Sequence, residues 1–202
     1  MQTTEEKTMT NQESLDLIAR MIRNTQDRIE RGAGKPFLIW GYTTLAVSLA
    51  VWYALKTTGN HHWNWLWFAI PAVGLACRMF SGRKSGPKMA TTFIDQAVKQ
   101  IWTTLGICAT GLSLYAAFSN HHIPILFMIA LLVFAGEAIT GGIIKLPYIK
   151  FMGLTGMLLS FGLPFLSGFD QVLGFGGLFL ATMIVPGHIM NTQSRKACKQ
   201  RS

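Results

Sequence analysis

Residues 123–144 read IPILFMIALLVFAGEAITGGII, and this stretch decides the fold class. As an α-helix, its 22 residues would cover about 33 Å, enough for the ~30 Å hydrocarbon core of a bilayer. Twelve of them are Leu, Ile, Val or Phe, which favour insertion by ~4–7 kcal/mol, whereas the single charged residue, Glu137, opposes it by ~3 kcal/mol. This balance predicts a transmembrane helix that carries one carboxyl group.

Glu137 lies deep inside this predicted helix. It follows Ile123 by 14 residues, so it would lie about 21 Å from that end of the helix and about 10 Å from the other. A glutamate side chain is too short to reach water from that depth. We therefore expect Glu137 to have a protein partner or to carry a proton.

The composition of the whole chain is that of a polytopic membrane protein. Half of its 202 residues are hydrophobic, 13% are charged, and the mean hydropathy is +0.33, whereas soluble domains carry about 25% charged residues. We predict an all-α membrane protein with six transmembrane helices, arranged as three in–out–in hairpins and preceded by an amphipathic cytoplasmic helix. The predicted spans are about residues 37–55, 63–80, 98–118, 123–144, 151–166 and 172–190.

This pattern divides the chain into three regions. Residues 1–35 form a cytoplasmic tail and amphipathic helix, residues 36–190 form the membrane domain, and residues 191–202 form a basic cytoplasmic tail. The three cysteines, at positions 77, 108 and 198, do not have CxxC spacing, and two lie inside apolar runs. We therefore expect neither a structural disulfide nor a cysteine zinc site.

The positions of the basic residues predict the orientation. With six spans, 17 of the 18 Lys and Arg residues fall on the side of the two termini, and only Lys56 falls on the other. By the positive-inside rule, both termini are cytoplasmic and the protein is a multi-pass protein of a bacterial-type inner membrane. The net charge of +9 is then a topology signal that also contacts anionic lipid headgroups, and nucleic-acid binding is not expected.

The N-terminal region predicts an amphipathic helix. Its apolar positions step by three and four residues and so share one face, which is formed by Leu15, Ile18, Ile22, Thr25 and Ile29. Gly32, Gly34 and Pro36 predict that this helix ends before the first span. The face fits a cytoplasmic protein partner or a second copy of the chain, and the alternatives are the membrane surface or the chain's own membrane domain.

An internal repeat points to a partner for Glu137. Asn-His-His occurs at residues 60–62 and again at 120–122, each time in a predicted outer loop. The offset of 60 residues relates Glu137 to Cys77, so Arg78 should lie within ~2 Å of Glu137 in depth. We predict an intramembrane pair between Glu137 and Arg78. It either fixes helix register or holds a carboxylate for protons or a cation; alternatively, Arg78 reaches the interface alone and Glu137 is protonated.

The histidines are further candidate functional residues. His188, near the end of the last span, is a possible polar neighbour of Glu137, although a position near the cytoplasmic interface is the commoner outcome. The outer-loop histidines form a possible divalent-metal or pH-sensing site, and the alternative is that they only occupy the membrane interface: His61, His62, His121 and His122. No other cofactor is expected.

Several small residues are spaced four apart and predict close helix packing within the bundle or between protomers. These pairs are Gly136 with Thr140, Ala138 with Gly142, Gly156 with Ser160, and Gly177 with Ala181.

The sequence indicates a non-enzymatic function. It has no phosphate-binding Gly-rich loop, no HExxH motif and no nucleophile elbow, and its polar intramembrane residues lie in separate spans. We predict a membrane anchor or regulatory subunit that uses its N-terminal helix to bind a partner or to self-associate. The first alternative is a small transporter or channel with Glu137 as its intramembrane carboxylate, and the second is a metal or pH sensor.

Overall fold

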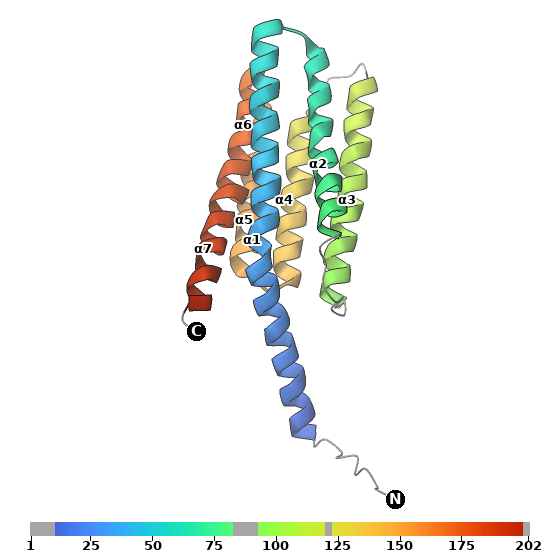
Figure 1. Cartoon of the computed structure of the whole chain (residues 1–202). Coiled ribbons are helices and arrows are strands. Elements are labelled where there is room, and N and C mark those ends of the chain that lie inside the picture. Colours follow the sequence, from blue (N-terminus) through green and yellow to red (C-terminus); the bar gives the residue numbers. More distant parts are fainter. Residues whose placement is uncertain (1–10, 83–92, 120–122, 200–202) are drawn as a thin grey trace, which may run out of the picture.

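The computed structural model describes residues 11–82, 93–119 and 123–199, and this part of the chain is helical without strands. Figure 1 shows an elongated bundle of roughly parallel helices, from one end of which the first half of α1 projects. The elements in chain order are α1 (Asn11–Thr58), η1 (His61–Phe68), α2 (Ala69–Gly82), α3 (Phe93–Phe118), α4 (Ile125–Ile143), α5 (Pro147–Ser160), η2 (Leu163–Phe165), α6 (Phe169–Phe179), η3 (Leu180–Ile184) and α7 (Val185–Lys199).

Five segments of the described residues are long and apolar enough to cross a membrane: Pro36–Thr58, Phe93–Phe118, Ile125–Ile143, Pro147–Phe165 and Phe169–Thr192. They correspond to the first, third, fourth, fifth and sixth predicted spans. The all-α fold with several membrane-crossing helices is therefore confirmed.

The second predicted span, residues 63–80, differs from the expected uniform α-helix. Its first part is the 3₁₀-helix η1, and α2 has 14 residues, so α2 alone covers only about 21 Å. Pro71 lies in the first turn of α2. Because proline has no N–H and its ring clashes with the carbonyl four residues earlier, it disfavours an α-helix that continues through it from upstream. The tighter helix η1 ends just before this position.

The helix predicted to end near Gly32 and Gly34 does not end there. α1 is one continuous helix of 48 residues with Pro36 inside it, so the expected break between the cytoplasmic helix and the first span is wrong. Proline is tolerated inside membrane helices when the surroundings compensate for the lost hydrogen bond. Next to Pro36, Phe37 packs against the bundle core, and Leu38 lies against Gly187 of α7, so tertiary contacts support the helix at this position.

The tightest packing in the bundle is between α4 and α5. A Cβ atom added at Gly153 of α5 would meet the backbone nitrogen of Ala138 and, at 2.7 Å, the carbonyl oxygen of Phe134. One added at Gly141 of α4 would meet the backbone of Lys150. Glycine at these two positions is therefore what allows the two helix backbones to touch.

The predicted small-residue pairs divide between the interior and the surface. Gly136, Thr140, Gly156 and Ser160 are buried, which confirms their packing role. In contrast, Gly177, Ala181 and Gly142 are exposed, and an added Cβ at either of these glycines would meet nothing within 4 Å. A spacing of four places two residues on one face, but it does not say which face is inside.

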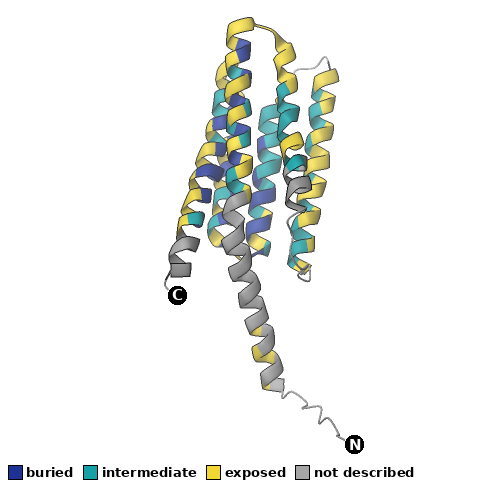
Figure 2. Cartoon of the chain, in the orientation of Figure 1, coloured by how far each residue is buried: buried dark blue, intermediate teal, exposed yellow. Residues whose placement is uncertain are grey.

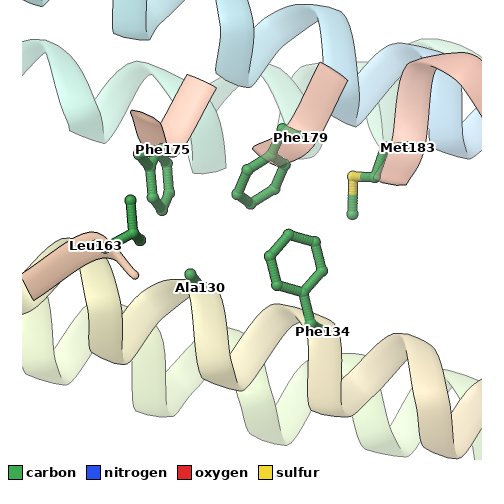
Figure 3. Packing of buried hydrophobic residues seen from close by; sticks show 6 residues of the cluster. All are labelled: Ala130, Phe134, Leu163, Phe175, Phe179 and Met183. Atoms are coloured by element: carbon green, nitrogen blue, oxygen red, sulfur yellow. The ribbon is translucent and has the colours of Figure 1, made fainter. Parts of the chain in front are cut away.

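Aromatic side chains fill the centre of the bundle. Phe134 of α4 packs against Phe179 of α6, with ring centroids 5.2 Å apart, and Phe175 packs against Phe179 at 4.8 Å. Figure 3 shows these residues facing one another across the core, together with Ala130, Leu163 and Met183. We call these six residues the aromatic layer. A second apolar layer lies at the α4–α5 turn and consists of Ile144, Leu146, Ile149 and Met190.

α6, η3 and α7 follow one another as a helical segment that contains a turn of π-helix, Leu180–Ile184. Pro186 follows this turn, and the ring of a proline clashes with the α-helical carbonyl four residues earlier. The wider π-helical turn accommodates that ring within the helical segment. At the other end of the segment, Gly168, with φ 58°, is the N-cap of α6, and Asp170 is the second residue of the helix. The sequence favours Asp170 as the cap of this helix, and the structure shows that this expectation is wrong.

Candidate functional site

Glu137 is the most unusual side chain of the described structure. It is completely buried, and it is among the largest fully buried side chains. Figure 2 shows the buried stretches of the bundle helices, α4 among them, in dark blue. Within the described part of the chain, neither of its carboxyl oxygens has a hydrogen-bond partner. Burial of an ionised carboxylate without a partner is strongly unfavourable, so this position requires a proton, an ion or a counter-charge.

The carboxyl group lies between the two apolar layers of the bundle. Phe134, three residues before Glu137, belongs to the aromatic layer, and Ile144, seven residues after it, belongs to the layer at the α4–α5 turn. Gly153 of α5 packs directly against the α4 backbone between Phe134 and Ala138, the turn that contains Glu137. Glu137 is thus enclosed from both ends of the bundle and by α5.

Thr140 is a second buried polar residue on the same face of α4. Its hydroxyl oxygen has no hydrogen-bond partner among the described residues. Three other buried hydroxyls, those of Ser48, Ser160 and Thr182, each donate to the carbonyl oxygen four residues earlier in their own helix, at 2.7–2.8 Å. Thr140 differs from them, and it stands one helical turn from the unpartnered carboxyl group.

Arg78, the predicted partner of Glu137, lies on α2, but its side chain is outside the described residues. α2 packs against α1 and η1, and Gly74, one turn before Arg78, lies against the ring of Trp40 on α1. The Glu137–Arg78 pair stays a prediction.

His188 lies on α7, on an exposed face of the bundle. The Tyr42 hydroxyl oxygen on α1 is 2.7 Å from His188 Nε2, and the two rings pack edge to face with centroids 5.9 Å apart. Since the Glu137 carboxyl has no hydrogen bond within the described part of the chain, His188 is not hydrogen-bonded to it. Instead, His188 and Tyr42 join α1 to α7 near the end of the bundle from which α1 projects.

The outer histidines are described only in part. His61 and His62 are exposed at the start of η1, where the side chain of Asn60 accepts a hydrogen bond from the backbone N–H of His62 at 3.0 Å. Asn60 is thus the N-cap of η1, which gives the first Asn-His-His motif a structural role. His121 and His122 lie outside the described residues, so the metal or pH-sensing hypothesis stays a prediction. Among the described residues, no three His, Cys, Asp or Glu lie together as a metal site.

The predicted partner-binding face of the N-terminal helix lies on the part of α1 that projects from the bundle (Figure 1). Leu15 is 66% exposed. The side chains of Ile18, Ile22 and Ile29 lie outside the described residues, although their backbones are helical.

No protein-family model, curated protein or solved structure matches this chain.

Two residues of these sites, Thr140 and Tyr42, are not among the functional candidates that the sequence predicts. The sequence predicts a packing role for Thr140, although its spacing of three residues from Glu137 also places the two on one helix face. The pairing of Tyr42 with His188 joins residues 146 positions apart, so no local pattern contains it.

Proposed function

We propose that this protein is a membrane anchor or regulatory subunit, and that residues 11–35 of α1 form a helical arm that binds a cytoplasmic partner or a second copy of the chain. The observation that supports this proposal is the continuity of α1 from the arm into the bundle. The arm covers about 37 Å, and its helix continues into a segment apolar enough to span the bilayer. A rigid link of this kind holds a partner at a fixed distance and direction from the membrane.

We further propose that the chain crosses an inner membrane six times, with both termini in the cytoplasm. Five of these crossings are the apolar segments described above. The remaining crossing, second in chain order, would consist of η1 and α2 together, which cover about 37 Å. Figure 1 supports an even number of crossings, since the arm of α1 and the end of α7 lie at the same end of the bundle. The distribution of Lys and Arg supports the cytoplasmic location of that end.

The test is co-purification in a mild detergent of the full chain and of variants of the arm. We expect the full chain to retain a stoichiometric partner or to self-associate, and a chain without residues 1–31 to lose that association. Exchange of Ile18 and Ile22 for serine should weaken association strongly. A matched control, Arg20→Gln with Asp27→Asn, changes the opposite face and should have little effect.

Two results would count against the anchor function. One is a full chain that is monomeric and has no partner. The other is an association that survives loss of residues 1–31, because the arm would then not be the binding element.

A second candidate function is a small transporter or channel, and the buried carboxyl of Glu137, which has no hydrogen-bond partner among the described residues, favours it. Polar residues inside a membrane bundle commonly mark ion or proton pathways. The two functions separate by mutation: Glu137→Gln should abolish ion flux in proteoliposomes and leave partner binding intact. Loss of residues 1–31 should have the reverse effect.

A further inference from the structure

The bundle interior contains two neighbouring polar side chains that have no bonding partner among the described residues. Glu137 and Thr140 are three residues apart on α4, so they lie on one face with Cβ atoms about 5–6 Å apart. A buried polar atom without a partner is rare in folded proteins and requires an explanation such as a bound ion or a catalytic role. Here three such atoms occur together between two apolar layers: the two carboxyl oxygens of Glu137 and the hydroxyl oxygen of Thr140.

The surroundings favour the smallest cation as the ligand. A metal ion such as Ca²⁺ takes about six to eight oxygen ligands. The two carboxyl oxygens of Glu137 and the hydroxyl of Thr140 supply three. The close backbone contact of Gly153 with α4 at this level leaves little room on the α5 side. A proton needs one oxygen, adds almost no volume and neutralises the carboxylate completely.

The charged and titratable groups on the helices that pack against α4 do not supply a bond to Glu137. Lys150 on α5 and Lys99 on α3 are exposed, and Asp170 is exposed in the first turn of α6. The other such groups on these helices are Asp95, Cys108, Tyr115 and Tyr148, and within the described structure none of them is hydrogen-bonded to the carboxyl of Glu137. The side chain of Arg78, the predicted partner of Glu137, lies outside the described residues, so the experiment includes it.

We propose that Glu137 and Thr140 form an occluded proton-binding site, in which the Glu137 carboxyl carries an exchangeable proton and the Thr140 hydroxyl relays it toward the α4–α5 turn. The two groups are not hydrogen-bonded to each other in the structure, so each transfer begins with a side-chain rotation that brings them together. The carboxyl O–H bond then breaks as Thr140 Oγ1 accepts the proton, and the original hydroxyl proton passes to a water molecule that enters at the α4–α5 turn. This inference rests on the second candidate function and specifies its ion. The assay below measures protonation and does not require transport.

Dicyclohexylcarbodiimide tests the site directly, because this apolar reagent modifies protonated carboxyl groups in apolar surroundings. The full chain in detergent is treated across a pH series, and the adduct is located by peptide mass spectrometry. We expect one adduct, on Glu137, whose yield falls as the pH rises. The exposed Asp170 is the internal control and should stay unmodified. Because the adduct is located in the native sequence, the result does not depend on the folding of a variant.

Three outcomes would overturn the proposal. Glu137 could stay unmodified at every pH in the folded protein and react only after denaturation. Arg78→Gln could switch modification on, which would show that an ion pair with Arg78 holds the carboxyl ionised. Na⁺ at constant pH could block modification, which would assign the site to a metal cation. If modification is as expected but proteoliposomes show no proton flux, the transporter function fails and the proton site stands.

The role of Thr140 has its own readout. Infrared spectra in D₂O follow deuterium exchange at the protonated carboxyl through its C=O stretching band. We expect Thr140→Val to slow this exchange several-fold and Thr140→Ser, which keeps the hydroxyl, to restore it. Equal exchange in the wild type and in Thr140→Val would refute the relay.

Discussion

At the scale of single residues, the packing of the bundle depends on glycines. At these positions the backbone of a neighbouring helix occupies the space that a side chain would fill. Gly153 is the clearest position, because an added Cβ would meet backbone atoms of Ala138 and Phe134, and backbone atoms cannot rotate away as a flexible side chain can. Gly142 on α4 is a matched contrast, with nothing within 4 Å of the same added atom.

We therefore expect Gly153→Ala to destabilise the protein by about 2 kcal/mol or more, because overpacking forces α4 and α5 apart. Thermal unfolding in detergent, followed by circular dichroism, measures the change. The control Gly142→Ala should leave the unfolding temperature unchanged or slightly raised. Equal effects of the two substitutions would show that the α4–α5 contact is not as close as described.

Lys145 is the one non-glycine residue of the described chain with positive φ, at 56°. The backbone N–H of Leu146 donates to the carbonyl of Gly141 at 3.0 Å, and the N–H of Lys145 donates to that of Gly142 at 3.3 Å. These two bonds form a Schellman motif that ends α4, with Lys145 at the position where glycine is usual. A basic residue here interacts favourably with the helix C-terminus, at some cost in backbone strain.

Lys145→Gly should accordingly stabilise the fold by about 1 kcal/mol. The control Lys150→Gly removes an equal charge from the same end of the bundle but replaces a residue within α5, so it should destabilise by about 1 kcal/mol. Unfolding midpoints of the two variants should thus move in opposite directions. Movement in the same direction would indicate that the lost charge, and not the backbone, dominates.

At the scale of elements, the continuity of α1 separates the structure from the sequence prediction. Two glycines and a proline within five residues are ordinary signals for a helix end. They are overridden here because the next residues, from Phe37 onward, pack into the bundle core. The helical arm is therefore an extension of a membrane span.

Distance measurements between spin labels test this continuity. With the three cysteines replaced by serine, labels at Leu15 and Tyr53, both exposed, should lie about 57 Å apart with a narrow distribution. A control pair at Ile39 and Tyr53, within the bundle part of α1, should lie about 21 Å apart. A shorter and broader first distance with an unchanged control would show a hinge near Pro36.

At the scale of the whole molecule, the number of membrane crossings determines on which side each end of the chain lies. Five segments of the described residues meet the length and hydropathy of a span, and η1 with α2 is the remaining candidate. Six crossings put both ends of the chain on one side, whereas five put them on opposite sides. The number of crossings therefore decides the location of the C-terminus relative to the helical arm.

Topology reporters fused after Ser202 and inserted at Gly59 test this arrangement. We expect the C-terminal fusion to report a cytoplasmic location and the Gly59 insertion an external one. A reporter at Lys145 gives a second, independent readout and should also be cytoplasmic. If η1 and α2 do not cross, the C-terminal and Lys145 reporters will both be external.

The sequence alone determined the class of the protein. Hydropathy and helix length are properties of one continuous stretch of sequence. Residues 123–144 could therefore be recognised as a membrane helix, and the depth of Glu137 within it calculated, without knowledge of the neighbouring helices. Transfer of a helix into lipid depends mainly on its own composition.

Only the tertiary structure decided which faces meet. In the structure, Glu137 and Thr140 lie between two apolar layers, and Tyr42 contacts His188. Gly153 is buried whereas Gly177 is exposed, and α1 continues through Pro36. Each of these facts depends on how a helix is rotated about its axis against partners remote in sequence. Because lipid is as apolar as the helices, the choice of faces depends on steric fit and on polar groups, neither of which hydropathy along the chain records.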